Sequence, residues 1–115
     1  MEIISTEELH GFLERGDPVV LIMAMSDAAF SMGHIPGSIN ATKASELGGL
    51  EDFDVPIVVY CTGPDCAASA IAYRQIVAAG YNNVRHYFGG LASWADAGHP
   101  IETGARAYPK TEEDS

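Results

Sequence analysis

Short apolar runs alternate with segments of helical periodicity along most of the chain. The runs at residues 19–22 and 56–60 are unbroken, a pattern typical of parallel strands that are covered on both faces. Residues 83–87 form a further candidate strand. Strands that alternate with helices predict an α/β fold with a largely parallel sheet and right-handed crossovers.

The first helix is predicted from its capping signals. Ser5 and Glu8 form a Ser-x-x-Glu capping box, and flanking apolar residues occupy the positions of a hydrophobic staple. Gly16, just before an Asp-Pro pair, predicts the end of the helix. The side chains expected on its buried face are Leu9, Phe12 and Leu13.

Two more helices are expected in the second half of the chain. A long helical pattern follows the loop at residues 62–65, and Gly80 predicts its end. A shorter helix is expected at residues 91–97, ending at Gly98. The side chains expected on the buried face of the long helix are Ala68, Ile71, Ala72, Ile76 and Ala79.

Length and composition place the chain among small globular domains. It has 115 residues, 47% of them hydrophobic, which suits one packed domain. We expect this domain at residues 1–101 and a polar, loosely ordered tail at residues 102–115. No apolar run approaches the roughly 20 residues that span a bilayer, and the first residues show no secretory signal. We therefore expect a cytoplasmic protein with no membrane partner.

The formal net charge of −10 argues against a nucleic-acid partner. Phosphate binding depends on lysine and arginine, and the chain has only six of these residues against sixteen acidic ones. The acidity would repel anionic substrates at long range or would only keep the protein in solution.

Cys61 has the sequence context of a reactive thiol. It follows a predicted buried strand and precedes a loop and a helix, and ligand chemistry in α/β folds lies beyond the carboxyl ends of strands. Uncapped N–H groups and the dipole of a nearby helix N-terminus would lower the pKa of the thiol, and the thiolate is the nucleophile. Gly63 would allow the loop to curl its N–H groups around the sulfur. The alternative is that Cys61 merely ends a strand.

Three segments together resemble the rhodanese family. Residues 33–40 (Gly-His-Ile-Pro-Gly-Ser-Ile-Asn) resemble its Gly-His-Ile-Pro-Gly-Ala-Ile-Asn signature, and residues 57–61 (Ile-Val-Val-Tyr-Cys) resemble its active-site strand and cysteine. Residues 80–84 and 89–91, with Trp94 and residues 97–100, resemble its C-terminal signature. The resemblance covers about residues 2–101, in order and with natural spacing.

The resemblance implies a three-layer fold with a five-stranded, mostly parallel sheet flanked by helices. It also implies a sulfurtransferase or sulfur carrier that forms a persulfide on Cys61. The implied partners are a small sulfur donor or protein persulfide, and a thiol or cyanide-like acceptor. The active-site loop that would hold the persulfide matches Thr62, Gly63, Pro64, Asp65, Cys66 and Ala67.

The chain departs from the family pattern at two cationic positions. Many active members carry Asp-x-Arg after their second strand, where this chain has Met23-Ala24-Met25, and their loop commonly ends in arginine, where this chain has Cys66. Thiosulfate, a dianion, would meet few cations, so it is expected to be a poor donor. A subset of rhodanese-like sequences shares the Cys-x-Gly-Pro-x-Cys loop. A phosphatase is excluded because such enzymes on this fold need a longer loop closed by arginine.

Other side chains leave alternatives open. Cys66 would be a resolving thiol, a second sulfur carrier or a packed small residue. His34 more plausibly fixes its turn by hydrogen bonding than acts as a base, and His86 is expected to be exposed at a strand end. Both histidines and both cysteines could be drawn as a zinc site, but no Cys-x-x-Cys pair supports it, so we expect no metal and no cofactor. The alternative function is a catalytically weakened binding or redox-sensing module that uses Cys61 and Cys66.

Overall fold

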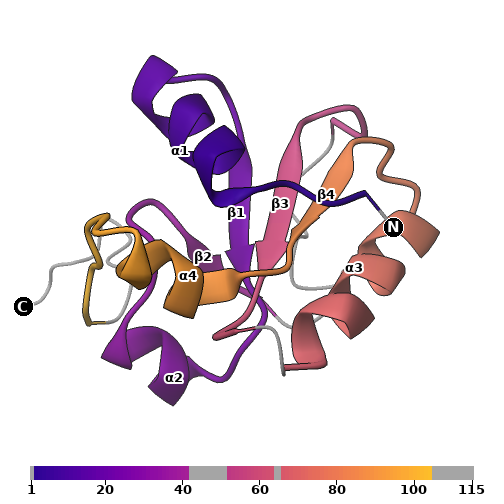
Figure 1. Ribbon diagram of the computed structural model, residues 1–115. Coiled ribbons are helices and arrows are strands. Elements are labelled where there is room, and N and C mark those ends of the chain that lie inside the picture. Colours follow the sequence, from indigo (N-terminus) through magenta and orange to yellow (C-terminus); the bar gives the residue numbers. More distant parts are fainter. Residues whose placement is uncertain (1, 42–51, 64–65, 105–115) are drawn as a thin grey trace, which may run out of the picture.

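The computed structural model describes residues 2–41, 52–63 and 66–104 (Figure 1). Its described strands form one parallel sheet in the order β2-β1-β3-β4. Because all pairings are parallel, the carboxyl ends of these strands meet at one edge, as the apolar runs predicted. The strands are β1 (Val20–Met23), β2 (Ile39–Asn40), β3 (Ile57–Tyr60) and β4 (Val84–Tyr87).

The sheet has four strands in the described part of the chain, not the five that the resemblance implied. At the outer edge of β4, Ile3 forms a single parallel bridge with His86. The N–H of Ile4 donates to the carbonyl of His86, and the N–H of His86 donates to the carbonyl of Glu2. The N-terminal segment therefore pairs with the edge of β4 through too few residues to count as a strand.

Helices cover both faces of the sheet (Figure 1). Leu9 of α1, Phe30 of α2 and Trp94 of α4 join one core cluster, whereas Ala72 and Ile76 of α3 join the other. This gives the three layers expected for an α/β domain. The helices are α1 (Thr6–Arg15), α2 (Asp27–Met32), α3 (Ala68–Ala78) and α4 (Gly90–Asp96).

The ends of α1 follow the predicted signals. Ser5 caps the helix, and the reciprocal capping box with Glu8 is present. Gly16 ends the helix in the left-handed region at φ 73°. Leu9 is fully buried, and the partly buried Phe12 and Leu13 pack against the same core. The short helix α2, which begins after a Ser26 cap, was not predicted.

The buried face of α3 differs from the prediction. Ala72 and Ile76 are buried as expected, but Ile71 is 50% exposed and Ser69 is buried instead. The side chain of Ser69 bonds to His86 on β4 at 2.7 Å. Ser69 therefore faces the sheet, whereas Ile71 and Ala79, which were expected on the buried face, are exposed.

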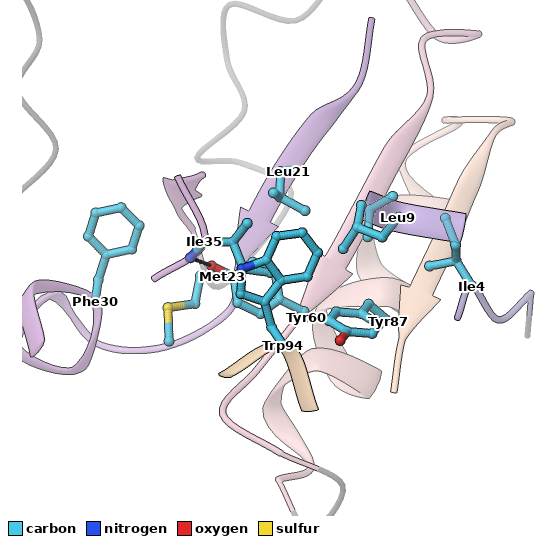
Figure 2. Packing of buried hydrophobic residues seen from close by; sticks show 10 residues of the cluster. Ile4, Leu9, Leu21, Met23, Phe30, Ile35, Tyr60, Tyr87 and Trp94 are labelled. Atoms are coloured by element: carbon cyan, nitrogen blue, oxygen red, sulfur yellow. Dashed lines mark hydrogen bonds between the residues drawn. The ribbon is translucent and has the colours of Figure 1, made fainter. Parts of the chain in front are cut away.

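Aromatic side chains fill the core on the face of α1 and α4. Figure 2 shows Trp94 among the side chains of the central strands, near Leu21 and Tyr60. The indole N–H of Trp94 donates to the carbonyl of Pro100 at 2.8 Å, which satisfies its one polar group.

None of the helices in the described ranges combines the length and the apolar character needed to cross a bilayer.

Candidate functional site

Cys61 lies immediately after β3, at the carboxyl edge of the sheet. Its side chain is only 1% exposed. The first turn of α4 holds its backbone, because the N–H of Leu91 donates to the carbonyl of Cys61 and the N–H of Ala92 donates to the carbonyl of Thr62, each at 2.9 Å. The segment that carries Cys61 is therefore held by α4, a helix that comes much later in the sequence.

Gly90 allows α4 to approach the cysteine this closely. Its φ is +65°, in the region that favours glycine. A Cβ atom at this position would lie 2.6 Å from the carbonyl oxygen of Cys61 and 2.8 Å from the backbone nitrogen of Gly63. Both the backbone conformation and the available space therefore require glycine.

Tyr60 anchors the end of β3 from the other side. Its hydroxyl oxygen accepts a hydrogen bond from the N–H of Ile35 at 2.9 Å (Figure 2). The same oxygen lies 2.7 Å from the Oγ of Ser38. Burial raises the pKa of Tyr60 to about 12, so the hydroxyl remains protonated at neutral pH. The segment at residues 33–40 thus supports the residue that precedes Cys61.

The two cysteines form a disulfide. The Cα atoms of Cys61 and Cys66 are 6.3 Å apart, within the range that a disulfide requires. The N–H of Cys66 donates to the carbonyl of Gly63 at 3.2 Å. Helix α3 begins two residues after Cys66, and no side chain caps its N-terminus, so the disulfide lies directly before uncapped N–H groups.

Met25 brings a third sulfur atom to the site. It lies two residues beyond β1, which is the neighbour of β3 in the sheet. Its Sδ is 3.2 Å from the Sγ of Cys61 and 3.8 Å from the Sγ of Cys66. The sequence pattern placed Met25 where many family members carry arginine and did not indicate a contact with the cysteines. Its position just past a neighbouring parallel strand was the signal that could have placed it here.

The structure describes some of the other residues expected in the active-site loop. Thr62 is exposed, and its Oγ1 lies 3.9 Å from the Sγ of Cys61. Gly63 is half-buried against Ala92 of α4. Ala67 is exposed at the start of α3. Pro64 and Asp65 lie outside the described residues.

The arginines of the described ranges are engaged or exposed elsewhere. Arg15 bonds to Asp17 at 2.9 Å, and the guanidinium of Arg85 lies 5.6 Å from the ring of Phe12. Arg74 is exposed on α3. No ion pair or hydrogen bond in these ranges joins an arginine to either cysteine.

His34 is buried and bonded through both ring nitrogens. Its Nδ1 lies 2.7 Å from the carbonyl oxygen of Phe30, and its Nε2 lies 3.0 Å from a carboxylate oxygen of Glu102. Backbone hydrogen bonds in both directions also join His34 to Glu102. These bonds fit the predicted structural role of His34. Glu102 was not predicted as its partner, because residues 102–115 were expected to form a loosely ordered tail.

His86 is buried, so the expectation of an exposed histidine was wrong. Its side chain is 4% exposed, and its Nε2 lies 2.7 Å from the Oγ of Ser69. Its Nδ1 has no hydrogen-bond partner in the described residues. Burial lowers the pKa of His86. The residue faces α3 because it lies opposite Val59, whose side chain is in the α3 core cluster.

Comparisons with known proteins agree with this geometry. Residues 5–97 match the family model of the rhodanese-like domain. The chain is 32% identical to the putative thiosulfate sulfurtransferase SseB of Mycobacterium tuberculosis, over 89% of the chain and 46% of SseB, so it spans about half the length of that relative.

A shorter relative matches over most of its own length. The thiosulfate sulfurtransferase GlpE of Actinobacillus succinogenes is 32% identical, over 78% of this chain and 81% of GlpE. The crystal structure of protein BH2092 from Bacillus halodurans has a TM-score of 0.81 at 19% identity, covering 89% of this chain and 77% of that one. This structural likeness supports the fold.

Proposed function

The chain belongs to the rhodanese-like domain family, and on this premise we propose that it is a sulfurtransferase or sulfur carrier that uses Cys61. The observation that carries the proposal is the position of Cys61 at the carboxyl edge of a parallel sheet, next to the start of α3. Relatives named thiosulfate sulfurtransferases support the class of reaction.

The proposed reaction has two displacement steps. The Cys61 thiolate attacks the sulfane sulfur of a donor, the bond between that sulfur and the rest of the donor breaks, and the leaving group departs with the electron pair. Cys61 then carries a persulfide anion. A nucleophilic acceptor attacks the outer sulfur, the S–S bond breaks, and the Cys61 thiolate is restored. The reaction requires the reduced form, so a dithiol must first open the bond to Cys66.

The donor we favour is uncharged or is a persulfide on another protein. Thiosulfate carries two negative charges, and Arg15 and Arg85 contact Asp17 and Phe12 rather than the cysteines. The net charge of −10 adds long-range repulsion of anions. Thr62 and Gly63 flank the sulfur and would contact the donor together with Pro64, Asp65 and Ala67.

The test is turnover by the reduced protein with a small organic persulfide as donor and cyanide as acceptor. The wild type should produce thiocyanate, and Cys61→Ser should produce none above background. Cys66→Ser is the matched control because it removes the second thiol and keeps the first. Equal turnover by Cys61→Ser and the wild type would contradict the proposal.

A redox-sensing module is the second candidate, and the Cys61–Cys66 disulfide favours it. Peroxide would convert the Cys61 thiolate to a sulfenic acid and release hydroxide. The Cys66 thiol would then displace water from it and form the disulfide. Oxidation would reversibly stop sulfur transfer. Peroxide treatment followed by non-reducing peptide mapping tests this, and a sulfinic acid on Cys61 beside a free Cys66 would contradict it.

A further inference from the structure

Three sulfur atoms from separate parts of the chain converge at the carboxyl edge of the sheet. Cys61 follows β3, Cys66 precedes α3 and Met25 follows β1. The Met25 thioether lies 3.2 Å and 3.8 Å from the two cysteine sulfurs, which are bonded to each other. Sulfur transfer through Cys61 does not require a thioether at this distance.

We propose that the reduced protein binds one copper(I) ion through the thiolates of Cys61 and Cys66 and the thioether of Met25. Thiolate and thioether ligands are soft and suit copper(I), zinc and iron–sulfur clusters. The site would hold a monovalent ion with two negatively charged ligands and one neutral ligand. The acidic chain adds a favourable long-range field for a cation.

The distances from Met25 to the two cysteines suit a trigonal site, provided that the two cysteine sulfurs move apart from bonding distance after reduction. With metal–sulfur bonds of about 2.3 Å, the ligand atoms of a planar three-coordinate site are about 4 Å apart. Met25 is already 3.8 Å from Cys66 and 3.2 Å from Cys61. Reduction of the disulfide by a dithiol or a phosphine lets the two cysteine sulfurs separate, and binding of copper(I) then releases the two thiol protons.

The surroundings favour copper(I) over zinc. Zinc in proteins takes four ligands in a tetrahedron, commonly with histidine among them. Within the described ranges no group of three His, Cys, Asp or Glu side chains is placed to hold a metal. His34 and His86 are held by Glu102 and Ser69. The burial of Cys61 limits access of water, which would otherwise supply a fourth, harder ligand.

The site would be separate in chemistry from sulfur transfer, although both use Cys61. A bound copper ion blocks attack on a sulfur donor, so the two activities exclude each other. Copper binding is measured on the reduced protein without any sulfur donor. The outcome is therefore independent of whether the protein transfers sulfur.

The experiment is an anaerobic titration of the reduced, desalted protein with copper(I), in competition with a chromophoric copper(I) chelator. X-ray absorption of the loaded protein then gives the ligands. We expect one ion per chain, with a first shell of three sulfur atoms. Met25→Leu should weaken binding at least tenfold and leave two sulfur ligands.

Met32→Leu is the matched control, because Met32 is 82% exposed on α2. It should bind copper(I) like the wild type with three sulfur ligands. Circular dichroism checks that each variant is folded, and the ligand count of the wild type does not depend on any variant. No binding, a two-sulfur shell in the wild type, or equal affinity in Met25→Leu would overturn the proposal.

Discussion

Replacement of Gly90 by alanine should distort the segment that carries Cys61. The new Cβ would lie 2.6 Å from the carbonyl oxygen of Cys61 and 2.8 Å from the nitrogen of Gly63. Both neighbours are backbone atoms, so no side-chain rotation relieves the clash. Either the start of α4 or the cysteine segment must move, and the two hydrogen bonds between them lengthen or break.

The expected cost has two parts. An alanine at φ +65° costs about 1–2 kcal/mol because of its backbone conformation. Displacement of the hydrogen bonds from Leu91 and Ala92 adds about 0.5–1.5 kcal/mol each. The free energy of unfolding should therefore fall by about 2–5 kcal/mol, a large fraction of the roughly 5–15 kcal/mol of a typical domain.

Gly98→Ala separates the cost of the backbone conformation from the cost of the lost hydrogen bonds. Gly98 also has a positive φ, of 84°, but a Cβ there would have no atom within 4 Å. The free energy of unfolding of Gly98→Ala should fall only by the cost of the backbone conformation, about 1–2 kcal/mol. Denaturant unfolding measures both variants, and alkylation of reduced Cys61 reports the local distortion. Equal losses of stability and unchanged alkylation in Gly90→Ala would refute the role assigned to Gly90.

Three further predictions concern the thiols and His86. After reduction, iodoacetamide should label Cys61 faster than Cys66, as expected for a nucleophile at the carboxyl edge of the sheet. Peptide mapping that finds Cys66 labelled first would reverse the assignment. Thiosulfate should be a poor sulfur donor for the wild type. In a thiosulfate:cyanide assay, Cys66→Arg should turn over thiosulfate faster than Cys66→Ser does. Equal turnover by the two variants would contradict the view that the lack of cations at the site weakens thiosulfate use. Burial lowers the pKa of His86 from its ordinary 6.5. Below about pH 6.5 the folded state therefore binds fewer protons than the unfolded state, and the free energy of unfolding falls as the pH falls. His86→Gln should flatten this decline in denaturant unfolding at several pH values, and an unchanged slope would contradict it.

Much of the fold was predictable because the relevant signals are local. The Ser5–Glu8 capping box and Gly16 mark both ends of α1, and the unbroken apolar runs mark β1 and β3. Cys61 could be placed at the carboxyl edge of the sheet because it directly follows an apolar run that is typical of a parallel strand. The short helix α2 has six residues, too few to show a clear apolar period.

The missed features depend on contacts between distant residues. Nothing local distinguishes Met25 from a methionine that packs in the core, since its place beside the cysteines follows from β1 and β3 being neighbours. Glu102 lies in a polar segment, and only the fold brings it to His34. Ser69 is buried against His86, a pairing across 17 residues that helical periodicity does not encode, and Ile71 is exposed.

The most direct test of the central claim is to locate a persulfide on the protein. The reduced chain is treated with a sulfane-sulfur donor and analysed by intact-mass spectrometry and by peptide mapping after alkylation. The account predicts the added mass of one sulfur atom, on the peptide that carries Cys61, in the wild type and in Cys66→Ser. An added sulfur found on Cys66 alone, or no added sulfur on either cysteine, would contradict it.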